Sequence, residues 1–163
     1  MKTPISLRSP IGTLIIDGTD EALTLIALPM PGRSSAGLPR GEDASALPGP
    51  LRQAVIQLGQ YFDGTRTEFD VPIKLSGTTF QCDVWRALGE IAYGKTVSYA
   101  ELAVMVGRPR ALRAVGQANG ANPLPIVLPC HRVVASGGRI GGYGGGLPMK
   151  RALLALEGIG GFG

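Results

Sequence analysis

One short stretch of the chain combines the residue types that nucleophilic chemistry requires. Cys130 follows Pro129, whose ring restricts the backbone, and precedes His131, the single histidine among the 163 residues. A thiolate is a strong nucleophile, but a free thiol with a pKa of about 8.5 is mostly protonated at neutral pH. A neighbouring imidazole can remove that proton. The stretch therefore predicts a cysteine nucleophile assisted by histidine, and the alternative is a cysteine that is only a small buried hydrophobe.

The position of the histidine leaves two routes for the proton. Neighbours in an extended chain point to opposite faces, so His131 cannot easily lie alongside the Cys130 sulfur. Either the chain bends at this point or a water molecule carries the proton. Once protonated, the imidazole needs a carboxylate partner. Glu157 is the candidate, because it ends a predicted helix at 148–157, where the helix dipole disfavours negative charge and the neighbours are apolar. A solvated surface glutamate is the alternative.

The glycine-rich segment 137–146 lies between these candidates. It lacks the Walker spacing of a phosphate loop, and it does not have the strand and helix context of a dinucleotide-binding turn. Its exposed backbone amides would suit a flat aromatic ligand, with Tyr143 as the lid.

Before residue 76 the pattern is that of a small α/β scaffold. Three strand patterns, separated by turn residues, lie at 5–8, 13–16 and 22–27. The Pro- and Gly-rich segment 29–50 is predicted to be a surface loop, and 51–62 has the periodicity of a helix. No chemical motif falls in this half of the chain.

Two capping boxes predict helix starts in the second half. The segment 78–81 opens one helix, which Tyr93-Gly94 would end, and 98–101 opens another, which Gly107 would close. In a capping box the side chain of a Ser or Thr accepts from a backbone N–H three residues later, and a Glu or Gln there bonds back.

A third helix is predicted to start at Pro109 and to run to about Gly120, which completes a helix-turn-helix pattern. Arg113, Gly116 and Gln117 share one face of it with Gly120. Glycine inside a helix costs about 1 kcal/mol relative to alanine. Such a face indicates close approach to something bulky, and packing against another helix is the alternative. The net charge of +4 favours a polyanionic partner.

The remaining cysteine, Cys82, is predicted to lie on the outer face of its helix, beside Arg86, as a bystander. Both thiols are expected to be reduced, with no disulfide. Structural zinc usually takes four Cys or His ligands and the chain has three, so neither a metal nor another cofactor is predicted. No apolar run is long enough for a membrane span, and the N-terminus lacks a signal-peptide pattern. These features predict a cytoplasmic protein, or a nuclear one in a eukaryote.

From Thr79 to Gly158 the chain closely resembles the O6-alkylguanine-DNA alkyltransferases, also called methylated-DNA–protein-cysteine methyltransferases. The strings that carry the likeness are Phe80-Gln81, Val84-Trp85, Tyr93-Gly94, Ser98-Tyr99, Arg113-Ala114-Val115-Gly116, Asn122-Pro123, Pro129-Cys130-His131-Arg132-Val133 and Gly142-Tyr143. The likeness is weak in the first half. Some relatives carry zinc ligands there, which this chain cannot supply, and some have a serine where Gly144 stands.

The resemblance implies a role for each matched residue. Cys130 would accept the alkyl group, His131 would deprotonate it through a water molecule, and Glu157 would hold the histidine. Asn122 would stiffen the turn that precedes the cysteine, and Tyr99 would press on a DNA phosphate and donate a proton. The residues implied to bind DNA are Arg113, Tyr99, Ala114, Gly116, Gln117 and Gly120. The residues implied to form the base pocket are Tyr143, Gly144, Gly145 and Val133.

The fold expected is α/β (α+β), with a small sheet-plus-helix domain at 1–76. A mostly helical domain at 77–163 would hold the helix-turn-helix and a short active-site strand. The resemblance implies a protein that flips O6-alkylguanine out of double-stranded DNA and takes the alkyl group irreversibly, with O4-methylthymine as a further candidate substrate. Nothing in the sequence demands a dimer, so a monomer is expected. The alternatives are a helix-turn-helix DNA-binding protein without transfer activity and a Cys-His hydrolase. The hydrolase would require a histidine well separated from the cysteine.

Overall fold

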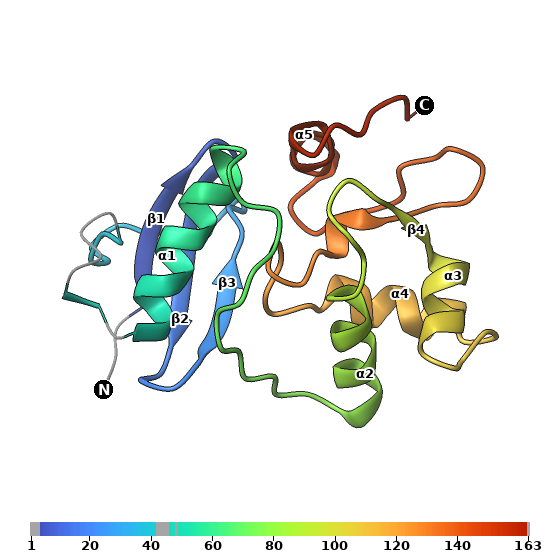
Figure 1. Ribbon diagram of the computed structural model, residues 1–163, viewed down its shortest axis with the longest axis horizontal. Helices are drawn as coiled ribbons and strands as arrows, with labels where there is room; N and C mark the ends of the chain where they lie inside the picture. The colour runs from blue at the N-terminus through green and yellow to red at the C-terminus, as the bar shows by residue number, and fades with distance from the viewer. Residues whose placement is uncertain (1–3, 42–45, 48, 163) are drawn as a thin grey trace. The chain divides into compact units, whose positions relative to one another are not determined.

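In the computed structural model, which describes residues 4–41, 46–47 and 49–162, the chain divides into two units, Met1–Leu75 and Ser76–Gly163. The first contains the main sheet and one helix, and the second contains the remaining helices and a two-stranded sheet (Figure 1). The predicted α/β fold class is confirmed. None of the helices in the described part of the chain is both long and apolar enough to cross a membrane.

The first unit is an antiparallel sheet covered by a helix. Its strands, in the order β1-β2-β3, are β1 (Ile5–Ser9), β2 (Gly12–Gly18) and β3 (Leu23–Ala27). The helix α1 (Gly49–Phe62) lies across them (Figure 1). Ile16 pairs with Ile5 and Ile26 and is fully buried, because alternate strand residues point into the core. The three strands were predicted, whereas α1 begins inside the predicted loop 29–50, of which residues 42–45 and 48 lie outside the described residues.

The second unit contains α2 (Thr79–Leu88), α3 (Tyr99–Met105), α4 (Leu112–Gly120) and α5 (Leu147–Leu156). The strands β4 (Val97–Ser98) and β5 (Val133–Val134) pair in parallel. Both predicted capping boxes are present. The Gln81 amide donates to the Thr78 hydroxyl at 3.0 Å, and the Glu101 amide donates to the Ser98 hydroxyl at 3.0 Å.

Two helix boundaries differ from the prediction. Helix α2 ends at Leu88, not at Tyr93-Gly94, because the amide of Gly89 already bonds back to Arg86 at 3.1 Å and closes the last turn. Helix α4 begins at Leu112 rather than Pro109. The Ala111 amide donates to the carbonyl of Arg108 at 3.0 Å, so Pro109 occupies the second position of a turn, which its fixed backbone angle also suits.

The helices α2, α3 and α4 pack against one another (Figure 1). The indole of Trp85 donates to the Ala118 carbonyl at 2.8 Å and joins α2 to α4 inside this core. Cys82 is buried, so its predicted position on an outer face is wrong. The reason is that both α3 and α4 pack against α2. Of the residues that follow Cys82 on this helix, Asp83 and Arg86 are the ones that face solvent.

Candidate active site

The backbone turns at the cysteine. Cys130–Arg132 form one turn of 3-10 helix, and the strand β5 starts only at Val133. The Cys130 amide donates to the Leu128 carbonyl at 2.8 Å, which tightens the approach. The extended stretch expected at the cysteine is therefore absent, and the chain bends there, as one of the two predicted routes requires. The side chains of Cys130 and His131 are both buried.

Asn122 spans the turn that leads from α4 to the cysteine. Its Nδ2 donates to the Leu128 carbonyl at 2.7 Å, and its Oδ1 accepts from the Leu124 amide at 2.9 Å. Inside this bracket Ile126 has φ = 77°, a left-handed conformation that is unusual for a β-branched residue. Such strain costs about 1–3 kcal/mol and persists only where surrounding contacts impose it. The amide side chain thus holds a strained turn immediately before Cys130.

The surroundings of the Cys130 thiol oppose and support its ionisation at once. Burial is the largest influence and raises the pKa of Cys130. The Asn122 side-chain amide, the positive charge of Lys150 and the Tyr143 hydroxyl act in the opposite direction and lower this pKa. The resting group is therefore a thiol, and donors are already in place for a thiolate once a base removes the proton.

A buried cluster lies directly behind the cysteine. The Nε2 atom of His131 is 2.6 Å from Oε2 of Glu157. The guanidinium of Arg132 donates to both carboxylate oxygens, at 2.8 Å from Nε and 3.1 Å from Nη2. The amide of Gly94 adds a fourth bond, at 3.1 Å. The predicted contact between His131 and Glu157 is present, and Glu157 is buried rather than solvated.

The protonation of His131 follows from these contacts. Burial lowers the pKa of His131, although the Glu157 carboxylate opposes this effect. A neutral imidazole facing a carboxylate must donate from Nε2, which leaves the lone pair on Nδ1. His131 is therefore arranged as a base rather than as a resting cation.

Two tyrosines lie near the thiol. Tyr99 is the first residue of α3, and burial raises the pKa of its hydroxyl, so it stays a donor at neutral pH. The Gly142 backbone acts in the opposite direction and lowers this pKa. At Gly141, where φ is 77°, a side chain would come within 3.1 Å of the Tyr99 ring, so the close approach requires glycine. The Tyr143 hydroxyl acts to lower the pKa of the Cys130 thiol, which indicates that it lies near the reacting atom.

The remaining predicted pocket residues border the same loop. Gly144 is exposed and Gly145 half-buried. The Val133 carbonyl already accepts a hydrogen bond from Lys150, at 2.7 Å. A carbonyl oxygen has two lone pairs, so it keeps the capacity for a second donor.

Two further buried charged residues, Lys150 and Arg132, were not predicted as site residues. Lys150 is fully buried, and its ammonium donates to the carbonyls of Val133, Ile140 and Gly142 at 2.7, 2.7 and 2.9 Å. Burial lowers the pKa of Lys150 to about 8. The sequence did contain a sign that Lys150 is buried. It lies three positions before Leu153, so the two residues share the buried face of α5. Nothing local distinguishes Arg132 from a surface arginine.

The predicted DNA-binding face of α4 is open. Arg113, Ala114, Gln117 and Gly120 are exposed, and Gly116 is half-buried. A side chain added at either glycine would meet nothing within 4 Å. Close packing of these glycines against another helix, the alternative interpretation, is therefore wrong. Helix α4 leads through Asn122 to the cysteine, so the open face and the thiol lie on one short segment.

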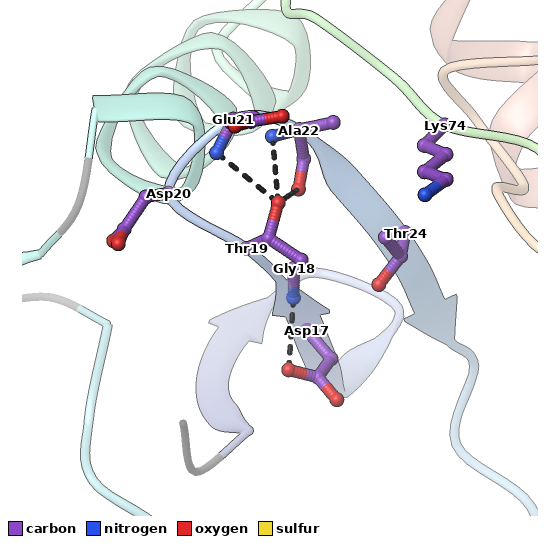
Figure 2. Close-up of a pocket in the computed structure, with 8 residues that line it drawn as sticks. All are labelled: Asp17, Gly18, Thr19, Asp20, Glu21, Ala22, Thr24 and Lys74. Carbon is purple, nitrogen blue, oxygen red and sulfur yellow. Dashed lines mark hydrogen bonds between the residues drawn. The ribbon is translucent and has the colours of Figure 1, made fainter. Parts of the chain in front are cut away.

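The first unit has a hollow at the β2–β3 turn, shown in Figure 2, which none of the predicted site residues lines. Asp17 accepts from the Gly18 amide at 2.8 Å, and the Thr19 hydroxyl accepts from the amides of Glu21 and Ala22 at 3.1 Å each. These bonds close the turn. Within the described ranges, no group of three or more His, Cys, Asp or Glu residues could hold a metal ion.

Comparison with known proteins places this architecture in a family. Residues 79–159 match the family model described as 6-O-methylguanine DNA methyltransferase, DNA binding domain. Residues 5–75 match the model described as 6-O-methylguanine DNA methyltransferase, ribonuclease-like domain.

Curated relatives and solved structures agree. The methylated-DNA–protein-cysteine methyltransferase of Mycolicibacterium paratuberculosis is 49% identical over 152 residues, covering 93% of this chain and 90% of the relative. The methylated-DNA–protein-cysteine methyltransferase of Methanosarcina barkeri is 42% identical over 151 residues, covering 93% of this chain and 94% of the relative. The crystal structure of Mycobacterium tuberculosis OGT in complex with DNA matches with 46% identity and a TM-score of 0.82, covering 94% of this chain and 91% of that one.

The fold and the site together describe a helix-turn-helix protein with a buried cysteine held against a His–Glu–Arg cluster. The chain belongs to the 6-O-methylguanine DNA methyltransferase family.

Proposed function

We propose that this protein repairs DNA by moving the alkyl group of O6-alkylguanine, mainly O6-methylguanine, onto Cys130 in one irreversible turnover. The observation that carries the proposal is the buried His131–Glu157 pair directly after a thiol that keeps its proton at rest. Membership of the family supports the reaction class of a methylated-DNA–protein-cysteine methyltransferase. O4-methylthymine is a further candidate substrate.

The chemistry proceeds by displacement at the alkyl carbon. His131 takes the proton of Cys130 through a water molecule, and Glu157 stabilises the imidazolium that forms. The thiolate attacks the carbon, a C–S bond forms, and the electron pair of the breaking C–O bond passes to the guanine. The hydroxyl of Tyr99, which remains protonated because its pKa is raised, donates a proton to the leaving base. A thioether has no easy hydrolysis route, so the protein is consumed.

Binding to DNA is assigned to the domain at 77–163, with 1–76 as its scaffold. A target atom inside a duplex requires that the base be flipped out, at a cost of a few kcal/mol. Arg113 enters the stack in place of the guanine, and Tyr99 presses on the neighbouring phosphate. The small residues Ala114, Gly116 and Gly120, with Gln117, let α4 approach the groove closely, because among the described residues of the second unit no side chain covers the two glycines.

The flipped base is held by the glycine-rich loop. Tyr143 and the amides of Gly144 and Gly145 line its pocket, and the carbonyl of Val133 accepts from the exocyclic amine. Asn122 keeps the turn before the cysteine rigid through its bonds to Leu128 and Leu124. The reaction needs no cofactor. We assign the protein to the cytoplasm, or to the nucleus in a eukaryote, as a monomer.

The experiment is a titration of the purified protein with a duplex that contains O6-methylguanine, followed by intact mass measurement and by counting of the guanine formed. The proposal predicts that one methyl group replaces one hydrogen per molecule and that guanine formation stops at one equivalent. A hydrolase would turn over repeatedly, and a DNA-binding protein without transfer activity would show no change in mass. Either of these results would overturn the proposal.

A further inference from the structure

Arg132 is the one charged side chain of the cluster that the proposed reaction leaves without a task. It is 5% exposed, and its Nη1 donates to the Ile91 carbonyl at 2.6 Å. Its other two bonds go to Glu157, one to each carboxylate oxygen. Beneath it the ring centroid of Tyr93 lies 5.6 Å from the guanidinium carbon. The guanidinium is thus fixed in one orientation by two segments of the second unit, the one that follows α2 and the end of α5.

The carboxylate of Glu157 serves two partners of different character. Each oxygen accepts two bonds, so its hydrogen-bonding capacity is largely used. Arginine is always charged in proteins, whereas the imidazole of His131 changes its charge near neutral pH. The permanent positive charge of Arg132 therefore offsets the negative charge of Glu157. The offset weakens the attraction of the carboxylate for a proton on the imidazole.

We propose that Arg132 is a positioning residue for the proposed transfer reaction: by neutralising Glu157 it keeps His131 uncharged at rest, with Nε2 donating to Glu157 and Nδ1 ready to accept the proton of Cys130. Without this charge, His131 and Glu157 would form an ion pair in the resting protein. An imidazolium cannot act as the base, although the carboxylate would still be there to hold it.

The other groups that face His131 act in known directions. Burial and the positive charges of Arg132 and Lys150 lower the pKa of His131, and Glu157 raises it. Cys130 precedes it in the chain and is a thiol at rest. The segment after α2 contributes the Ile91 carbonyl and the Tyr93 ring to Arg132, and the Gly94 amide to Glu157. Arg132 is therefore the removable positive charge that shares the carboxylate with the imidazole.

The test is direct because the chain has a single histidine. An NMR titration of DNA-free protein follows one imidazole and needs no assignment. In Arg132→Met the pH midpoint of the His131 titration should rise by about 1 unit or more, as expected when a nearby positive charge is removed from an imidazolium. Arg132→Lys keeps the charge while losing the two-pronged geometry, and its midpoint should stay close to that of the wild type.

The catalytic consequence rests on the proposed function and is measured separately. At a pH below both midpoints the single-turnover transfer rate of Arg132→Met should be about tenfold lower than that of the wild type, because a midpoint shift of about 1 unit lowers the neutral fraction of the imidazole tenfold there. The ratio to the wild-type rate should recover as the pH is raised above the new midpoint. If transfer is absent from the wild type, the proposed function fails while the imidazole titration still decides the role of Arg132.

A folded Arg132→Met protein whose imidazole titrates at the wild-type midpoint would overturn the proposal and leave Arg132 a structural residue. If the unbalanced carboxylate prevents folding, Arg132→Gln takes the place of Arg132→Met, because its amide can still donate to the Glu157 carboxylate while the positive charge is lost. The imidazole midpoint of Arg132→Gln should rise as well. An unchanged midpoint there would contradict the proposal equally.

Discussion

The two units of the chain bury very different side chains. In the first unit, the buried polar residues among those described are Ser6 and Gln57, and both are neutral. Gln57 bonds to Asp70 and fastens the segment after α1. In the second unit a lysine, an arginine, a glutamate and a histidine are all buried within 28 residues of sequence, Cys130 to Glu157.

This difference separates a scaffold from a site. Burying a charge is expensive unless it is paired and hydrogen-bonded, and a hydrophobic core of equal size usually provides at least as much stability. The first unit follows that rule. The second unit departs from it around one thiol, and every buried charge there has hydrogen-bond partners. A costly arrangement that is fully satisfied indicates a function that the apolar alternative could not perform.

The largest expected effect contrasts the two cysteines. Cys130→Ser should bind DNA and transfer nothing, because a hydroxyl is a far weaker nucleophile than a thiolate. Cys82→Ser should transfer at close to the wild-type rate, since Cys82 belongs to the helical core. Single-turnover transfer from an O6-methylguanine duplex measures both. A large loss of transfer in folded Cys82→Ser would break the contrast between core and site.

A smaller effect is expected at the open face of α4. Arg113→Ala should slow repair of the duplex by roughly 10- to 100-fold, because base flipping costs a few kcal/mol and only the duplex requires it. Its reaction with free O6-methylguanine base should be nearly unchanged. Rates on the two substrates are compared for the same preparation. Equal losses on both would place Arg113 in the chemistry instead of in DNA binding.

Alkylation should destabilise the protein. The methyl group stays as a thioether in the buried site of Cys130, and extra carbon in a packed site costs about 1–3 kcal/mol. The melting temperature should fall by several degrees, with roughly 2–4 °C or a little more for each kcal/mol. Proteolysis should quicken first near Asn122, which holds the strained turn at Ile126. A methylated protein that melts at or above the temperature of the free protein would contradict this.

The smallest effect is a pH dependence of stability. Burial places the pKa of His131 in the folded state below its ordinary value of 6.5. Between these two values the unfolded chain binds a proton that the folded chain does not. The free energy of unfolding therefore rises with pH in this window and falls as the pH drops below 6.5, by at most about 1.4 kcal/mol per unit. Urea unfolding of wild type and His131→Gln measures it, and an identical slope in both would exclude His131 as the source.

Local chemistry predicted the elements that local chemistry determines. The capping boxes at Thr78 and Ser98 were visible because their partners lie three residues away. The start of α4 was misplaced because Pro109 suits both a helix and a turn, and the turn over Arg108–Ala111 is what forms. Whether the chain bends at Cys130 was not decided from the sequence, since an apolar stretch that contains prolines does not determine its backbone conformation.

In the candidate site, too, the residues that were predicted are those with a local sequence signal. The contact between Glu157 and His131 was predicted because the position of Glu157 conflicts with its own helix. Lys150 was missed because the carbonyls that it joins come from β5 and from the loop before α5, and their convergence is a tertiary property. Arg132 was quoted only as part of a motif, although it completes the cluster around the carboxylate.

The most direct test of the whole account is the location of the transferred group. Wild-type protein is reacted with a duplex that carries O6-methylguanine with a ¹³C-labelled methyl group, and the peptides are mapped by mass spectrometry. The account predicts one labelled methyl group per molecule, on the sulfur of Cys130, with unlabelled Cys82. Label on Cys82 or on another side chain of the folded protein would contradict the assignment of the buried cluster to alkyl transfer.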